Sequence, residues 1–378
     1  MNTTGIGSEA RSSMAVAYAA DVGDLGLALA DVVLLFACNE RFAPYFSVAL
    51  QSVVEHMDHA RHYDVVVMTD DIAPQTAATL TRQVVEGSHG AAAIGFLDVN
   101  EAFERLAAPK LRTHGHFRRQ TYFRLLAPEL LRVPKALYLD SDLVVLRDLA
   151  PLFDTDLTGR LLAATQDVDT IGQACGYDAT VMRYLHRDLG MASELDYFQA
   201  GVILFNLDEF RRRRPTAELI DTAARRMWRW ADQDVLNMAA SDDYVRVDLR
   251  WNSLYDWEGF RRARIVAQAP AAQRAAFEAA YADPWVVHYA GPDDRPWLYP
   301  RCDRGELFWE YAARSPFYPE IRRRLDDSRR TARGLLKRAQ VFALYRGQSL
   351  FDFVFRPGTP ARTAIIAGFR AIGGGRLI

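Results

Sequence analysis

The sequence has few cysteines and no long uncharged apolar segment. Its three cysteines stand far apart and none belongs to a Cys-x-x-Cys pair: Cys38, Cys175 and Cys302. This spacing excludes a disulfide framework and predicts a reduced, cytoplasmic setting. No uncharged stretch approaches the ~20 residues of a membrane-spanning helix. The apolar residues near the N-terminus are interrupted by aspartates and lack a basic start, which argues against a secretory signal.

Charge is distributed unevenly along the chain. The formal net charge is −2, but residues 321–378 contain 13 Lys and Arg against 3 Asp and Glu. These residues therefore carry about +10, and residues 1–320 carry about −12. The sequence thus combines an acidic body with a basic tail.

Buried strands alternate with helices through the first half of the chain. Residues 1–30 are small, polar and aperiodic, and we expect a loosely ordered leader there. Apolar strands are then predicted at 31–39, 63–71, 93–99 and 135–140, and helices at 44–57, 76–86 and 118–131. Such alternation predicts a mainly parallel sheet covered by helices on both faces.

The second half has shorter apolar segments and fewer helices between them. Strands are predicted at 143–146, 159–167, 200–206 and 285–291, and helices at 216–230 and 232–241. The sheet should therefore be mixed. After Pro300 the pattern becomes helical and basic, so we expect a leader at 1–30, a catalytic domain at 31–300 and a helical region at 301–378.

Two carboxylates interrupt the apolar segment "ALYLDSDLVVL", residues 136–146. Asp140 ends a predicted strand, and ligands of open α/β sheets bind outside the carboxyl ends of strands. Asp142 follows two residues later and can point the same way. Two converging carboxylates repel unless a cation lies between them. Mg²⁺ or Mn²⁺ would accept these oxygens together with phosphate oxygens, which predicts a metal-bridged nucleoside diphosphate.

Four motifs follow one another over about residues 31–300. They are "LYLDSDLVVLRDLAPLF", "YFQAGVILFNLDEFR", "DQDVLN" and "VVHYAG" followed by "RPW". In these motifs and their order the chain resembles glycosyltransferase family 8, which includes bacterial lipopolysaccharide galactosyl- and glucosyltransferases and glycogenin. The resemblance implies a GT-A nucleotide-sugar-binding fold. It also implies retaining transfer of galactose or glucose from a UDP-sugar, with Mn²⁺ as cofactor and Mg²⁺ as the alternative.

The resemblance assigns the metal ligands and the catalytic positions. Asp140 and Asp142 match the family's DxD motif, and His288 matches its third protein ligand. Asp167 and Asp232 match acids that bind sugar hydroxyls. Gln233 matches an amide near the anomeric carbon, where we expect an electrostatic role because an amide is a poor nucleophile.

Further positions match contacts to the donor. Ala37 and Asn39 fall where relatives hold the nucleoside, with Asn39 replacing a common Asp, and Phe42 falls where an aromatic ring could stack on the base or pack in the core. The other matched positions are His116, Arg124, Ser141, Gln199, Gly291 and Arg295. Gln199 replaces the Asn of close relatives. The loop after Gly291 is one residue longer than usual, and Arg295 replaces a Lys that faces the diphosphate.

Two other interpretations stay open from the sequence. A metal-dependent nucleotidyltransferase also uses acids at a sheet edge, although "HYAG" and "DQDVLN" speak against it. A nucleotide-sugar-binding module without transferase activity would explain Asn39 and the lengthened loop. No nucleic-acid partner is expected.

The family resemblance and the basic tail indicate which acceptor the protein uses and where in the cell it lies. By analogy with the family, the acceptor would be lipopolysaccharide or another cell-surface saccharide, lipid-linked saccharides included. Apolar residues at helical spacing, at 335, 336, 339, 342 and 343, predict a helix that lies on an anionic membrane. This places the protein on the inner face of the cytoplasmic membrane, with packing of the tail on the body as the alternative.

Overall fold

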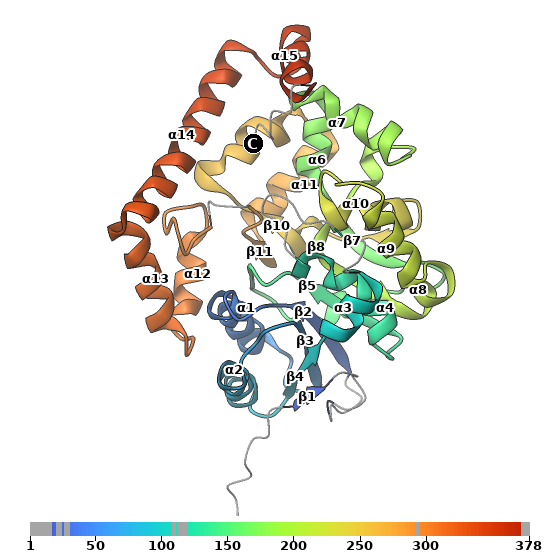
Figure 1. The fold of residues 1–378 in the computed structure, drawn as a ribbon, viewed down its shortest axis with the longest axis vertical. Coiled ribbons are helices and arrows are strands. Elements are labelled where there is room, and N and C mark those ends of the chain that lie inside the picture. Colours follow the sequence, from blue (N-terminus) through green and yellow to red (C-terminus); the bar gives the residue numbers. More distant parts are fainter. Residues whose placement is uncertain are drawn as a thin grey trace, which may run out of the picture.

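A mixed sheet of eight strands forms the centre of the protein (Figure 1). The computed structural model describes residues 17–19, 25, 31–107, 111, 119–291 and 295–371. The strand order is β1-β4-β3-β2-β5-β8-β7-β9. A second sheet of three strands, in the order β10-β11-β6, lies at the carboxyl end of β5.

The first half of the large sheet is parallel and almost fully buried. Its strands are β1 (Ala17–Ala19), β2 (Val32–Ala37), β3 (Tyr63–Thr69), β4 (Ala92–Asp98) and β5 (Lys135–Leu139). They pair in parallel from β1 to β5. The helices between them are α1 (Ala43–His56) and α2 (Pro74–Gly87), each with a proline in its first turn, where no intrahelical N–H bond is lost.

The second half contains the antiparallel pairs. Strand β8 (Phe198–Asn206) runs antiparallel to both β5 and β7 (Leu162–Gln166), and β9 (Tyr244–Arg246) pairs in parallel with β7. The small sheet consists of β6 (Leu143–Val145), β10 (Ser253–Leu254) and β11 (Val286–His288). The predicted mixed, mainly parallel α/β fold is therefore confirmed.

Helices lie on both sides of the large sheet (Figure 1). In the view of Figure 1, α1, α2, α12 and α13 lie to one side of it, and α3, α4, α8 and α9 lie to the other. The remaining helices up to residue 312 are α3 (Asn100–Leu106), α4 (Ala127–Leu130), α5 (Ala150–Phe153), α6 (Val168–Gly172), α7 (Ala179–Arg183), α8 (Leu207–Arg213), α9 (Thr216–Ala224), α10 (Ala231–Ala240), α11 (Ala271–Ala282) and α12 (Gly305–Ala312).

Three local predictions differ from the structure. The helix expected at 118–131 is a 3₁₀ helix, Arg119–Leu126, followed by the single turn α4, which begins beside Pro128. The helix expected at 216–230 ends at Ala224. Within the leader, the described residues are β1, which extends the sheet beside β4, and Leu25, which is buried against Gly95.

The C-terminal helices form an arm along the body (Figure 1). They are α13 (Tyr318–Arg330), α14 (Ala332–Val354) and α15 (Pro360–Ala371). Helix α13 contacts α1 and α14, and α15 contacts α7. Among the described residues, no helix combines the length and the apolar character needed to cross a bilayer.

A buried polar cluster fixes the end of this arm to the body. The Arg362 guanidinium of α15 lies 2.7 Å from Asp352 of α14, and both side chains are almost fully buried. Arg362 also donates to the backbone oxygen of Tyr177 at 2.8 Å. The Tyr177 hydroxyl donates to Asp352 and accepts a hydrogen bond from Gln348. Because each polar group has a partner, this cluster holds α14 and α15 against residues 173–183.

Arg362→Met should release α15 and the adjacent half of α14 without unfolding the body. Removing one partner of a buried ion pair costs about 3–5 kcal/mol, because the other charge stays buried. Hydrogen exchange, followed by mass spectrometry, should become at least about a hundredfold faster in residues 345–366. The control is Arg356→Ala, which changes an exposed arginine between the same helices. Unchanged exchange in Arg362→Met would contradict the anchoring role.

Candidate metal and ligand site

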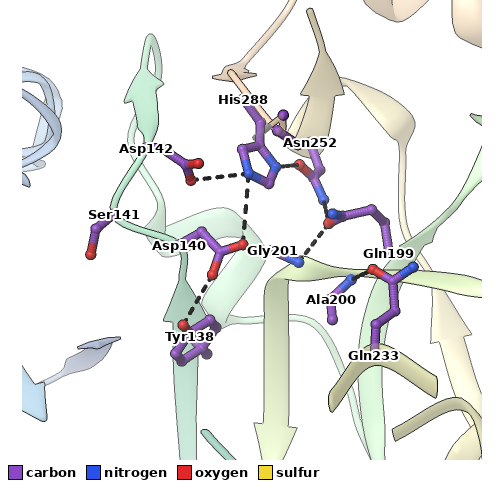
Figure 2. Close-up of polar contacts among 12 residues, drawn as sticks. Tyr138, Asp140, Ser141, Asp142, Gln199, Ala200, Gly201, Gln233, Asn252 and His288 are labelled. Atoms are coloured by element: carbon purple, nitrogen blue, oxygen red, sulfur yellow. Dashed lines mark hydrogen bonds and ion pairs between the residues drawn. The ribbon is translucent and has the colours of Figure 1, made fainter. Parts of the chain in front are cut away.

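The two aspartates of the DxD segment lie between the large and the small sheet (Figure 2). Asp140 directly follows β5, and its backbone N–H donates to the oxygen of Gly201 in β8 at 2.8 Å. Asp142 directly precedes β6. Between them, the Ser141 hydroxyl donates to the backbone oxygen of Ala37 at 2.8 Å, which joins the turn to the end of β2.

His288 approaches both aspartates from the small sheet. It ends β11, which pairs antiparallel with β6 so that His288 lies opposite Leu143. Its Nε2 lies 3.2 Å from an oxygen of Asp142 and 3.6 Å from an oxygen of Asp140. One ligand atom from each of the three residues lies within 4.8 Å of the others.

The tautomer of His288 is set by Asn252. The Nδ1 atom of His288 lies 2.8 Å from the amide oxygen of Asn252, whose amide nitrogen donates to Gln199. An amide oxygen only accepts, so Nδ1 carries a proton, and Nε2 is the ring nitrogen that faces the two carboxylates. These three side chains could hold a divalent cation, and the Asn252 contact is of the kind that orients metal-binding histidines.

Gly201 leaves space for the side chains of His288 and Asp140. A Cβ at this position would lie 2.3 Å from Cε1 of His288 and 2.9 Å from an oxygen of Asp140. Any other residue there would displace a ligand side chain. The glycine of the "YFQAGV" segment is therefore required by close packing around the site.

Arg295 and His288 favour the charged form of Asp142. Burial by itself raises the pKa of Asp142, but the Arg295 guanidinium, 3.0 Å away, and the His288 ring together more than offset this and lower the pKa to about 2. Asp142 is thus a carboxylate at neutral pH. The guanidinium also lies over the rings of Phe42 and Trp297.

Arg124 joins Asp140 to a third aspartate. Its buried guanidinium lies 2.7 Å from Asp140 and 2.9 Å from Asp232, and it packs over the ring of Tyr138. Burial lowers the pKa of Arg124, but the two carboxylates raise it further, so the side chain stays a cation. Burial raises the pKa of Asp232 to about 7, against the opposing effect of Arg124.

Asp232 and Gln233 are aimed into the same cleft by the start of α10. Ala231, which precedes them, is buried and has φ of 47°, a strained value for a residue with a side chain. The Gln233 amide oxygen accepts from the N–H of Ala200 at 3.0 Å, and its nitrogen donates to Asp167 at 2.9 Å. Both the oxygen and the nitrogen of the Gln233 amide are therefore held in place.

Asp167 is held at the end of β7, where it begins α6. Its carboxylate accepts from the N–H of Thr170 at 2.9 Å and from Gln233. Burial raises the pKa of Asp167 to about 6, with Asp169 adding to the effect. Arg261 is the nearby cation that opposes this rise.

A cleft of about 520 Å³ brings most of the predicted site residues together. The predicted residues that line it are Ala37, Phe42, Arg124, Asp140, Ser141, Asp142, Asp167, Gln199, Asp232, Gln233, His288, Gly291 and Arg295. Asn39 is not among the lining residues; its side-chain oxygen accepts from the N–H of Phe42 at 2.9 Å, just before α1. His116 lies outside the described residues.

Sequence analysis missed several residues of the site. Asn252 orients His288, but nothing in "RWNSL" distinguishes it from an ordinary loop asparagine. Val341, Leu344 and Tyr345 of α14 also line the cleft. In the sequence, Val341 and Leu344 are recognisable only as apolar residues outside the predicted amphipathic stripe.

The chain is similar to known glycosyltransferases. Residues 33–300 match the model of glycosyl transferase family 8. Glycosyltransferase GlyF of Streptococcus pneumoniae is 27% identical over 284 residues, which cover 74% of this chain and 60% of GlyF. General stress protein A of Bacillus subtilis is 20% identical over 275 residues, which cover 71% of this chain and 88% of that protein.

Solved structures show the same fold. The apo structure of the bifunctional glycosyltransferase WbbM has a TM-score of 0.68 at 26% identity, over 79% of this chain and 52% of WbbM. Galactosyltransferase LgtC, solved with donor and acceptor sugar analogues, has a TM-score of 0.59 at 24% identity, over 75% and 96% of the two chains. This chain therefore spans about half of WbbM and 60% of GlyF.

The raised pKa of Asp167 predicts a pH-dependent stability difference. The folded carboxyl, with a pKa of about 6, binds its proton more tightly than the unfolded one, with a pKa of about 3.9. The free energy of unfolding should therefore fall as the pH rises from about 4 to 6. Asp167→Asn removes this loss, so its free energy of unfolding relative to wild type should rise by roughly 1–3 kcal/mol between pH 4 and 8.

Urea denaturation at several pH values measures this difference. Glu101→Gln, which neutralises an exposed carboxylate on α3, is the control and should show no such trend. If the free energies of unfolding of Asp167→Asn and wild type differ by the same amount at every pH, the pKa of Asp167 is not raised in the folded protein.

Proposed function

The chain belongs to glycosyl transferase family 8, and from this membership we propose that it moves galactose or glucose from a UDP-sugar to a saccharide acceptor with retention of anomeric configuration. The observation that carries the proposal is the group of Asp140, Asp142 and Nε2 of His288. It faces a cleft that also holds sugar-binding acids and amides.

Asp140, Asp142 and His288 would hold the cation that bridges the diphosphate. Two carboxylates and one imidazole suit Mn²⁺, which accepts nitrogen more readily than Mg²⁺ does. When bound, the metal supplies Lewis-acid stabilisation of the departing UDP. Arg295 is placed to move from Asp142 to a phosphate oxygen, where its guanidinium can bind two oxygens at once.

The residues on the far side of the cleft would orient the sugar. Asp232 and Asp167 offer carboxylate oxygens to its hydroxyl groups, and Gln199, which accepts from Asn252 and from the N–H of Gly201, lines the same cleft. Gln233 is fixed by Ala200 and Asp167, so it acts by its dipole near the anomeric carbon. We propose a front-face attack, in which the leaving phosphate accepts the proton of the acceptor hydroxyl.

The two rival functions make different products. A nucleotidyltransferase releases pyrophosphate, and a binding module releases neither pyrophosphate nor UDP. Incubation of the enzyme with UDP-galactose and UDP-glucose in Mn²⁺ should release UDP by slow hydrolysis of one donor. Release of pyrophosphate, or of no product from either donor, would contradict the proposal.

We further propose that the C-terminal region, residues 301–378, holds the catalytic region, residues 31–300, on the inner face of the cytoplasmic membrane. Helix α14 has an outward face of exposed apolar side chains, listed with their exposed fractions: Leu335 51%, Leu336 60%, Leu350 64%, Phe353 76% and Val354 58%. Its opposite face includes the buried side chains of Val341, Gln348 and Asp352. Arginines of α13 and α14 add attraction to anionic lipid. A lipid-linked saccharide of the lipopolysaccharide type would meet the enzyme there.

UDP affinity should depend on Mn²⁺ and on Asp142. In calorimetry, Mn²⁺ should strengthen UDP binding to wild type, and Asp142→Asn should weaken the Mn²⁺-dependent binding by at least about tenfold, because one ligand charge is lost. Asp98→Asn, which changes the exposed aspartate at the end of β4, is the matched control. Equal UDP affinity in all three proteins, with and without Mn²⁺, would refute the metal bridge.

The outward face of α14 should determine vesicle binding. Wild type should sediment with phosphatidylglycerol vesicles at low salt, and the variant Leu336→Glu/Leu350→Glu/Phe353→Glu should not, because it puts charge into the apolar face. Met227→Glu changes an exposed apolar residue elsewhere and should bind like wild type. If the triple variant sediments as wild type does, or if wild type stays in solution, α14 is not the membrane contact.

A further inference from the structure

A second cavity adjoins the cleft under α14. Val341, Leu344 and Tyr345 of α14 line the cleft that contains the candidate metal site. The second cavity, of about 270 Å³, lies between α14 and residues 257–264. Tyr345 lines both, so the two cavities are neighbours at this side chain.

Aromatic rings form the floor and walls of the second cavity. Trp257 stacks on Tyr299 at 5.2 Å with an interplanar angle of 20°, and Tyr345 meets Trp257 edge-on at 5.3 Å. Phe342 lies 6.1 Å from Trp257 between ring centres and is 48% exposed. Stacked and edge-on contacts fix these rings, so a flat apolar platform exists before any ligand arrives.

Polar groups surround this platform. Glu258, Arg264, Arg346 and Ser349 line the same cavity, and Arg346 lies 3.9 Å from Glu258. Glu258 has φ of 53° and ψ of 26°, a left-handed conformation that is unfavourable for a residue with a side chain. Such strained residues concentrate at ligand-binding sites, where the surrounding structure holds them.

We propose that this cavity is an acceptor subsite, which binds a sugar unit of the saccharide at some distance from the hydroxyl that is glycosylated. Pyranose rings have apolar C–H faces and a rim of hydroxyl groups, which match an aromatic platform edged by carboxylate, guanidinium and hydroxyl groups. The inference deepens the proposed function and rests on it. It names Trp257, Tyr345 and Ser349 as acceptor-binding residues.

The anchoring of the arm supports a preformed subsite. Because Arg362, Asp352 and Tyr177 fix α14 to the body, the wall that α14 contributes does not have to assemble when the acceptor binds. The two faces of α14 then have separate roles. The inward face contacts the saccharide, while the outward face with Leu336 and Leu350 contacts lipid.

A glycan array tests the subsite with fluorescently labelled, full-length enzyme in Mn²⁺ and UDP. Trp257→Ala removes the platform, and Ser349→Trp fills the cavity without removing a contact of the body. Both variants should lose at least about tenfold in retention of the glycans that wild type binds. Leu336→Ala, on the outward face of the same helix, should bind the array as wild type does.

Calorimetry with UDP distinguishes a failure of the subsite from a failure of the proposed function. Trp257 and Ser349 do not line the donor cleft, so both variants should bind UDP within about twofold of wild type. Equal glycan binding by wild type and both variants, or no glycan bound by a wild type that binds UDP, overturns the subsite. A wild type that does not bind UDP overturns the proposed function itself.

Discussion

The candidate site depends on the convergence of two carboxylates and one imidazole nitrogen. Asp140 follows a strand of the large sheet, Asp142 precedes a strand of the small sheet, and His288 faces both with Nε2. The two carboxylates repel each other unless positive charge lies beside them. The strands β5, β6 and β11 fix the backbone on both sides, and a divalent ion held by the three side chains would offset the remaining repulsion.

Two arginines extend this constraint outward. Arg124 pairs with Asp140 from the buried side, and Arg295 pairs with Asp142 from the loop side. Each arginine neutralises part of the charge of the two carboxylates, but the two side chains differ in how deeply they are buried. Arg124 is enclosed and also holds Asp232, so it links Asp140 to one of the acids proposed to bind the sugar. Arg295 is more exposed, which leaves it able to exchange a carboxylate for a phosphate.

Sequence reasoning predicted the strands and the convergence of Asp140, Asp142 and His288 for a clear physical reason. Buried parallel strands are continuous apolar segments, so the charges that interrupt or end them, such as Asp140 and His288, are conspicuous. Asn252 and Tyr345 could not be recognised, because their roles arise from loops and a helix that are distant in sequence. Asn39 does not line the cleft, and its contact with the nucleoside stays a prediction. The helix expected to end near residue 230 ends at Ala224, and the next helix, α10, begins at Ala231, which has a left-handed conformation.

Anomalous diffraction at the manganese absorption edge tests the central claim most directly. Crystals grown with Mn²⁺ and UDP should show one strong anomalous peak, bonded to Asp140, Asp142 and Nε2 of His288 and to oxygens of the diphosphate. UDP bound in the cleft without a peak at these three residues would contradict the account. A peak held by other side chains, with His288 still turned only toward the two carboxylates, would contradict it as well.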